Sequence, residues 1–279
     1  MRLHAPAKLN LCLYLGAPRE DGLHELCSLF EPLALADLIE VSPSERDEVV
    51  CPGVEGENLA ARALAGLRER GWEHEPLRVE IEKRVPVAAG LGGGSGDAAA
   101  VLRLAAGEVA DLPRLAAELG ADVPSQLRPS LALVRGAGER VEPLPEPAEH
   151  AAVLLPGGGG LSTAAVFAEA DRLGLGRSAA ELDELAARLR AVAGAGTSPL
   201  AYPELLVNDL TDAALSLRPE IGEALDALRA AGAPVAILSG SGPTAVGLFP
   251  DLASAQDAAA ATGYEEAIVC AAGHARLTP

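Results

Sequence analysis

Hydrophobic and polar residues alternate near the start of the chain. Leucines occupy every second position over residues 9–15, and Lys8, Asn10 and Cys12 lie near or between them. A period of two is typical of a β-strand with one buried face. Residues 2–16 are therefore expected to form a strand that turns its lysine and asparagine outward. An Asp-Gly turn and further apolar strand sequence follow.

Later segments show apolar residues at helical spacing, and shorter β-rich runs separate them. Because strands and helices mix without a regular βαβ alternation or a repeat, the expected fold class is α+β. The expected helices are residues 58–70, 96–106, 111–119 with Asp111 as N-cap, a segment from Ser162, 179–193, 204–216, 219–231 and 252–262. The expected strands are residues 77–85, a hairpin over 131–144, 150–155, two strands flanking residues 239–242, and 265–273.

A Pro- and Glu-rich stretch, EPLPEPAEH, interrupts the pattern at residues 142–150. Such a composition is typical of a linker. With 279 residues the chain can bury more than one core. We therefore expect an N-terminal domain over residues 1–148 and a C-terminal domain over residues 149–279.

Charge and cysteine content restrict the partners. Lys and Arg number 22 against 40 Asp and Glu, a formal charge of −18, which argues against nucleic acid or an anionic membrane. The four cysteines form no CxxC pair, so they predict neither a zinc site nor a disulfide framework but reduced, mostly buried thiols. The sequence begins without a cleavable leader pattern, and no run of about 18 apolar residues occurs. The expected location is the cytoplasm.

The segment PVAAGLGGGSGDAA, from residue 86, joins a β-rich run to an alanine-rich helix. Glycines let backbone N–H groups approach a ligand, and the N-terminus of a helix favours an anion, so the loop predicts a phosphate site. A P-loop is excluded because no lysine follows Gly90 in the loop. A dinucleotide fingerprint fits poorly because no βαβ chain follows. A plain turn stays the alternative. The run at residues 157–160 is interpreted as a loop lip, and the SGSG turn at 239–242 as a second small-residue turn able to face phosphate.

Three residues, Lys8, His24 and Asp122, have side chains suited to catalysis or binding, but none of them indicates a functional role on its own. A lysine on an open strand face, such as Lys8, is usually solvated. His24 directly follows a turn, where histidine is more often structural. Asp122 lies in LGADVP, a short turn in which aspartate usually bonds the backbone or caps a helix. Taken alone, each residue favours a structural role.

Taken together, PAKLNLCL, DGLHEL, PVAAGLGGGSGDAA, LGADVP, NDL and LSGSGPTAVGLF resemble the GHMP kinases (galactokinase, homoserine kinase, mevalonate kinase and phosphomevalonate kinase). The resemblance covers nearly the whole chain in the right order. It is greatest to the branch that phosphorylates 4-diphosphocytidyl-2-C-methyl-D-erythritol in non-mevalonate isoprenoid precursor biosynthesis.

The resemblance implies a two-lobed fold with the active site in the cleft, ATP as phosphoryl donor, Mg²⁺ as helper, and transfer to the 2-hydroxyl of that substrate. The partners would be these small molecules, with no nucleic acid or membrane, and the chain would be a monomer or homodimer. The implied catalytic residues are Lys8 and Asp122. The implied nucleotide-binding residues are Asn58, Lys83, Pro86, Val87, Ala88, Ala89, Gly90, Leu91, Gly92, Gly93, Gly94, Ser95 and Gly96, with Ser95 also toward the metal. The implied substrate-binding residues are Asn10, Leu23, His24, Phe167, Gly240 and Ser241.

The chain departs from the family pattern at three places. Gly96 stands where a second serine is usual, Leu23 where an aromatic precedes the histidine, and Ser125 and Gln126 where an aromatic pair follows GADVP. The alternatives are a GHMP kinase for homoserine or mevalonate, and a catalytically silent GHMP fold that only binds nucleotide. A Rossmann dehydrogenase fits less well.

Overall fold

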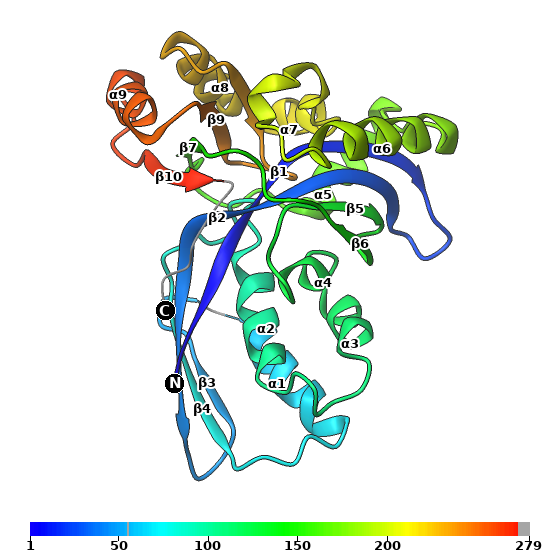
Figure 1. Cartoon of the computed structure of the whole chain (residues 1–279), viewed down its shortest axis with the longest axis vertical. Coiled ribbons are helices and arrows are strands. Elements are labelled where there is room, and N and C mark those ends of the chain that lie inside the picture. The colour runs from blue at the N-terminus through cyan, green and yellow to red at the C-terminus, as the bar shows by residue number, and fades with distance from the viewer. Residues whose placement is uncertain (55, 273–279) are drawn as a thin grey trace.

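The computed structural model describes residues 1–54 and 56–272, and its architecture is the α+β fold expected from the sequence. Its central element is a pair of long antiparallel strands, β1 (Arg2–Pro18) and β2 (His24–Pro43). They pair from Arg2 opposite Glu40 to Pro18 opposite His24, with bulges between. Figure 1 shows these two strands running from one end of the molecule to the other.

The second edge of β2 is shared among three partners. Residues 26–30 pair with β5 (Ala132–Gly136), Leu33 with β10 (Ile268–Ala272), and residues 38–43 with β4 (Leu77–Glu82). The sheet path is β3-β4-β2-β10-β7-β9-β8, and β6 pairs with β5. Because β2 pairs with strands of both lobes, the packing of both lobes holds the middle of β2 in position.

The first lobe gathers α1 to α4 at one end of the molecule (Figure 1). Apolar faces of α1, α2 and α3 pack with β4 and the second half of β2 into one core, which includes Leu67, Trp72 and Ile81. The remaining elements of this lobe are β3 (Glu48–Val50), α1 (Leu59–Glu69), α2 (Gly93–Arg103), α3 (Leu112–Leu119) and α4 (Val123–Gln126).

The second lobe packs helices on the antiparallel strands β7 to β10, around a core that includes Leu155, Leu228 and Phe249. Its elements are β6 (Arg140–Pro143), β7 (His150–Leu155), α5 (Thr163–Leu173), α6 (Ala179–Ala193), α7 (Thr211–Leu217), α8 (Glu220–Ala230), β8 (Val235–Leu238), β9 (Ala245–Phe249) and α9 (Leu252–Thr262). A third core, with Leu9, Leu29 and Leu154 among its members, joins the two lobes.

Local capping chemistry confirms several of the predicted helix starts. Asn58 and Ser162 each accept a backbone N–H of the following turn, and Ser178 forms a capping box with Glu181. A side-chain oxygen there satisfies a donor that the helix itself leaves free. Asp111 occupies the N-cap position of α3 as predicted, but the residue is left-handed (φ 59°) and its side chain makes no capping bond.

The helix predicted over residues 204–216 is confirmed only from Thr211 onward. Two short 3-10 turns, η1 (Pro199–Ala201) and η2 (Pro203–Leu205), come first, and α7 begins only at Thr211. The intervening residues pair with β1 instead, through bonds described below. The helix predicted from residue 96 begins earlier, at Gly93, and the last predicted strand is β10, whose expected final residue, 273, lies outside the described residues.

Both faces of β1 are buried, so the expectation that one face points to solvent is wrong. Lys8 is 5% exposed and Asn10 1%, because the glycine loop packs against Lys8 and the SGSG turn packs against Asn10. Three of the four cysteines are buried and all four are free. Within the described ranges, no helix has the length and apolar character needed to cross a bilayer.

Candidate active site

A cavity of about 540 Å³ opens where the two lobes meet. Its wall is built from the middle of β1 and β2, the loop before α2, and the starts of α4 and α5. Residues from the segment between β3 and α1, among them Cys51 and Asn58, line one part; Phe30, Thr163 and Phe167 line another. A volume of this size is typical of a small-molecule site.

Lys8 lies in the wall of this cavity with three partners. Its Nζ donates to Asn10 Oδ1 at 2.5 Å, lies 3.1 Å from Asp122 Oδ2, and sits 4.6 Å from the centroid of the Phe30 ring. The Asn10 amide is oriented by a second hydrogen bond, in which its Nδ2 donates to Ser28 Oγ at 3.0 Å. A buried ammonium with this many contacts has one fixed position.

Asp122 stands at the N-cap position of α4, yet its side chain caps nothing. The carboxylate instead faces Lys8 from the other side of the cavity, with 29% of its side chain exposed. The capping bond favoured by the turn pattern alone is therefore not made. One carboxylate oxygen pairs with the ammonium, and the side chain keeps access to the cavity.

The glycine loop ends directly in α2. Gly92 is its N-cap in the left-handed region (φ 67°), no side chain caps the helix, and its first turn holds no acidic residue. The first backbone N–H groups of a helix have no acceptor within the helix, and the dipole places partial positive charge there. A helix start of this kind can hold a phosphate group with its backbone donors. The loop is attached to β1, because Lys8 N donates to Leu91 O at 2.9 Å.

Glycine is required at two positions of this loop by close packing. A Cβ on Gly90 would lie 2.5 Å from Ser239 O, and a Cβ on Gly92 would lie 2.8 Å from Lys8 Cγ. The SGSG turn at residues 239–242 thus packs backbone to backbone against the loop. Ser239 Oγ reinforces this contact by donating to Gly90 O at 3.0 Å.

A buried charge cluster lies beside the loop. Lys83 contacts Asp37 and lies 2.8 Å from Asp97 Oδ2, while Asp37 also accepts the N–H groups of Arg84 and Val85 at 2.6 and 2.8 Å. Burial alone would lower the pKa of Lys83, but the two carboxylates outweigh it and raise that pKa. Burial raises the pKa of Asp97, against the pull of Lys83. The cluster fixes the strand end that leads into the loop.

Most of the residues implied by the family resemblance line the cavity. Gly96 does not: it is buried in α2, where a Cβ would lie 3.0 Å from Pro6 O. Leu23 is 51% exposed and also lies outside the lining. Ser125 and Gln126 are buried and do not line the cavity either. The implied residues that line it are Lys8, Asn10, Asn58, Lys83, Pro86, Val87, Ala88, Ala89, Gly90, Leu91, Gly92, Gly93, Gly94, Ser95, Asp122, Phe167, Gly240 and Ser241.

His24 contacts a residue of the cavity wall, Phe167, without lining the cavity itself. The two ring centroids are 5.1 Å apart, and His24 Nε2 lies 2.8 Å from Asp171 Oδ1. His24 is 8% exposed and does not itself line the cavity. Its contacts hold the aromatic side chain that does line it.

Several residues of the site were missed by sequence reasoning. Phe30 lies under the Lys8 ammonium, and Asp37 and Asp97 hold Lys83. The signal available for Asp37 was an acidic residue within an apolar strand, which is costly unless it is paired. Thr163 was missed as well: its Oγ1 lies 2.9 Å from Ser241 Oγ, across the wall.

Comparison with known proteins identifies the family of this chain. Residues 58–128 match the family described as GHMP kinases N terminal domain, and residues 201–264 match GHMP kinases C terminal. The 4-diphosphocytidyl-2-C-methyl-D-erythritol kinase of Kineococcus radiotolerans is 41% identical over 261 residues, which cover 86% of this chain and 78% of that protein. The chain belongs to the GHMP kinase family. The kinase of the same description from Streptomyces avermitilis is 38% identical, over 87% of this chain and 85% of that protein.

Solved structures agree with this family assignment. A crystal structure of 4-(cytidine 5'-diphospho)-2C-methyl-D-erythritol kinase matches with a TM-score of 0.80 and 37% identity, covering 98% of this chain and 99% of that one. Homoserine kinase from Cytophaga hutchinsonii matches with a TM-score of 0.70 at 19% identity, over 97% of this GHMP kinase and 93% of that chain. The second likeness shows the shared fold alone. The chain is a small-molecule kinase, and ATP is its co-substrate.

Proposed function

We propose that this kinase transfers the γ-phosphoryl group of ATP to the 2-hydroxyl of 4-diphosphocytidyl-2-C-methyl-D-erythritol, a step in isoprenoid precursor biosynthesis. Relatives that carry this name are 38–41% identical over most of the chain. The observation that carries the mechanism is the Lys8–Asp122 pair, 3.1 Å apart, in one cavity with the uncapped start of α2.

Phosphoryl transfer needs alignment and charge screening more than covalent help. Asp122 accepts the proton of the acceptor hydroxyl as the oxygen bonds to the γ-phosphorus. The bond from that phosphorus to the bridging oxygen breaks, and ADP leaves with the electron pair. Asn10 and Phe30 hold the Lys8 ammonium in place, and its positive charge stabilises the developing alkoxide.

The two parts of the cavity suggest where each substrate binds. The triphosphate would meet the N–H groups at the start of α2, with the nucleoside toward Asn58 and Lys83. The cytidyl group would lie against Phe167, whose ring His24 supports. Asn10, Gly240 and Ser241 would line the path between that ring and the catalytic pair.

Mg²⁺ fits the donors present. In kinases this ion takes one or two protein oxygens and completes its shell with phosphate oxygens and water. Among the described residues no three His, Cys, Asp or Glu side chains gather in a metal cluster. We propose the Ser95 hydroxyl as the protein ligand, since Ser95 lines the cavity at the start of α2. Bound there, the ion would neutralise charge on the phosphates.

The direct test is ADP release from ATP with the cytidyl substrate, with homoserine and mevalonate as controls. The proposal expects turnover with the cytidyl substrate and rates near background with the other two. Preferential turnover of homoserine or mevalonate would contradict the substrate, and ATP binding without turnover of any acceptor would favour a silent nucleotide-binding fold. The domain boundary at residues 148/149, a monomeric or homodimeric state and a cytoplasmic location stay predictions.

A further inference from the structure

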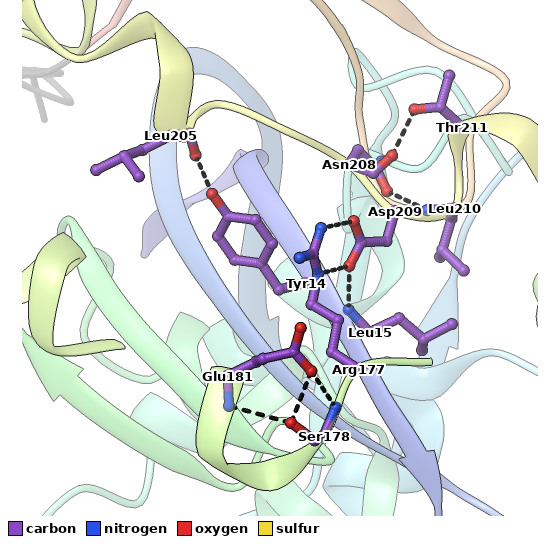
Figure 2. Close-up of polar contacts among 10 residues, drawn as sticks. All are labelled: Tyr14, Leu15, Arg177, Ser178, Glu181, Leu205, Asn208, Asp209, Leu210 and Thr211. Carbon is purple, nitrogen blue, oxygen red and sulfur yellow. Dashed lines mark hydrogen bonds and ion pairs between the residues drawn. The ribbon is translucent and has the colours of Figure 1, made fainter. Parts of the chain in front are cut away.

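One motif of the sequence has no role in the site as described so far. NDL at residues 208–210 lies between η2 and α7 and does not line the cavity. Figure 2 shows its surroundings, where Asn208 and Asp209 lie next to β1 and to Arg177. The segment is bonded to β1: Leu13 N donates to Val207 O, and Asp209 N donates to Leu13 O, each at 2.8 Å.

The side chain of Asn208 is buried and fully engaged. Its Nδ2 donates one hydrogen to Leu238 O at 2.8 Å and the other to Gly240 O at 2.7 Å. Its Oδ1 accepts the N–H of Leu210 at 2.9 Å. Two donors facing carbonyls and one acceptor facing an N–H leave a single amide orientation that satisfies every group.

Both carbonyls held by Asn208 belong to the SGSG turn or to the residue before it. The turn also closes on itself, since Gly242 N donates to Ser239 O at 2.9 Å. Asn208 therefore sets the position of this turn from the side that faces away from the cavity.

The other side of the turn lies against the catalytic residues. A Cβ built on Gly240 would be 3.2 Å from Asn10 Oδ1 and 3.7 Å from Lys8 Nζ. Ser239 Oγ donates to the carbonyl of Gly90 in the phosphate loop. A shift of the turn would thus reach both the loop and the lysine through direct contacts.

We propose that Asn208 is a positioning residue for phosphoryl transfer. By holding the carbonyls of Leu238 and Gly240, it sets the turn that packs between Gly90 and the Lys8–Asn10 pair. This inference rests on the proposed function for its kinetic readout. It adds a residue that touches neither substrate yet determines where the catalytic groups stand.

Asp209 supplies a matched control one residue away. Its carboxylate accepts Arg177 Nε and Nη2 at 2.6 and 2.7 Å, and Leu15 N at 3.0 Å (Figure 2). Arg177 also lies 5.0 Å from the centroid of the Tyr14 ring. These bonds stabilise the fold, but none of them reaches the SGSG turn.

The test compares Asn208→Ala and Asn208→Asp with Asp209→Asn. Asn208→Asp keeps the acceptor for Leu210 N but turns carboxylate oxygen toward two carbonyls. We expect kcat to fall about 10- to 100-fold in both Asn208 variants, because displacement of catalytic groups by about 1 Å costs on this order. KM for ATP should change less than threefold, and the Asp209 variant should lose stability to urea while kcat stays within about threefold of the parent.

Hydrogen exchange gives a second readout that does not depend on the substrate. The amides of Ser239 and Gly242, which donate to Thr244 O and to Ser239 O, should lose protection in the Asn208 variants and keep it in the Asp209 variant. If the parent phosphorylates none of the acceptors while this protection pattern holds, the proposed function fails and the control of the turn stands. Equal kcat losses at both positions, unchanged turn protection, or failure of both Asn208 variants to fold would overturn the positioning role.

Discussion

Replacing Gly92 by alanine separates the backbone role of the phosphate loop from its control of Lys8. The residue is left-handed, which costs an L-residue about 1–2 kcal/mol, and the stiffer unfolded chain returns about 0.4–1 kcal/mol. We therefore expect a net loss of roughly 1 kcal/mol in the free energy of unfolding. The added Cβ would also lie 2.8 Å from Lys8 Cγ and 3.1 Å from Lys8 Cε.

The lysine stem has to yield, because carbon atoms at rest lie about 3.5–4.0 Å apart. A displacement of roughly half an ångström or more would carry the ammonium away from Asp122 and Asn10. Since a shift of about 1 Å costs on the order of 10²-fold in rate, we expect kcat of Gly92→Ala to fall about 10- to 100-fold. The assay is ADP release at saturating ATP and cytidyl substrate, with urea unfolding in parallel.

Gly107 is the matched control, because it has φ +86° and nothing within 4 Å of a built Cβ. Gly107→Ala should lose a similar free energy of unfolding and keep its kcat. If the two variants have the same kcat, the loop does not control the lysine and the reasoning is refuted.

Three further outcomes follow from the same contacts. Lys83→Met leaves two buried carboxylates without their counter-ion and should lower the free energy of unfolding by about 3–5 kcal/mol, measured in urea; a loss under about 1 kcal/mol would contradict the cluster. Phe167→Ala should raise KM for the cytidyl substrate roughly fivefold or more, since base stacking contributes about 1–3 kcal/mol, and an altered KM for ATP instead would place the base elsewhere. Burial alone would lower the pKa of His150, but its bond to Glu31 outweighs this and raises that pKa. The folded pKa exceeds the unfolded one, so the pair's stabilisation is complete below about pH 6.5 and is lost as pH rises through the folded value. The coupling free energy from Glu31→Gln and His150→Gln should therefore be smaller at pH 9 than at pH 6, and equal values would refute the assignment.

The sequence could predict the parts of the fold that depend on local chemistry. Polar side chains at Asn58 and Ser162 cap helices because the capping bond spans only a few residues. The glycine loop could be placed for the same reason, since strand, loop and helix are adjacent in the chain.

What failed depended on distant packing. The alternation in β1 could not reveal that the glycine loop and the SGSG turn pack against its polar face, so Lys8 was expected to face solvent. The segment before α7 has helical composition, yet it forms no α-helix because its hydrogen bonds go to β1 and to the SGSG turn. Asp122 pairs with Lys8, which lies 114 positions earlier in the chain. No local sequence pattern around Asp122 indicates this partner.

The most direct measurement is the single-turnover rate of Asp122→Asn, with ATP affinity determined on the same protein. A general base contributes about 10²–10⁴ in rate, so the account predicts a loss of that size with the dissociation constant for ATP changed less than threefold. Phosphoryl transfer at the parent rate by Asp122→Asn would contradict it.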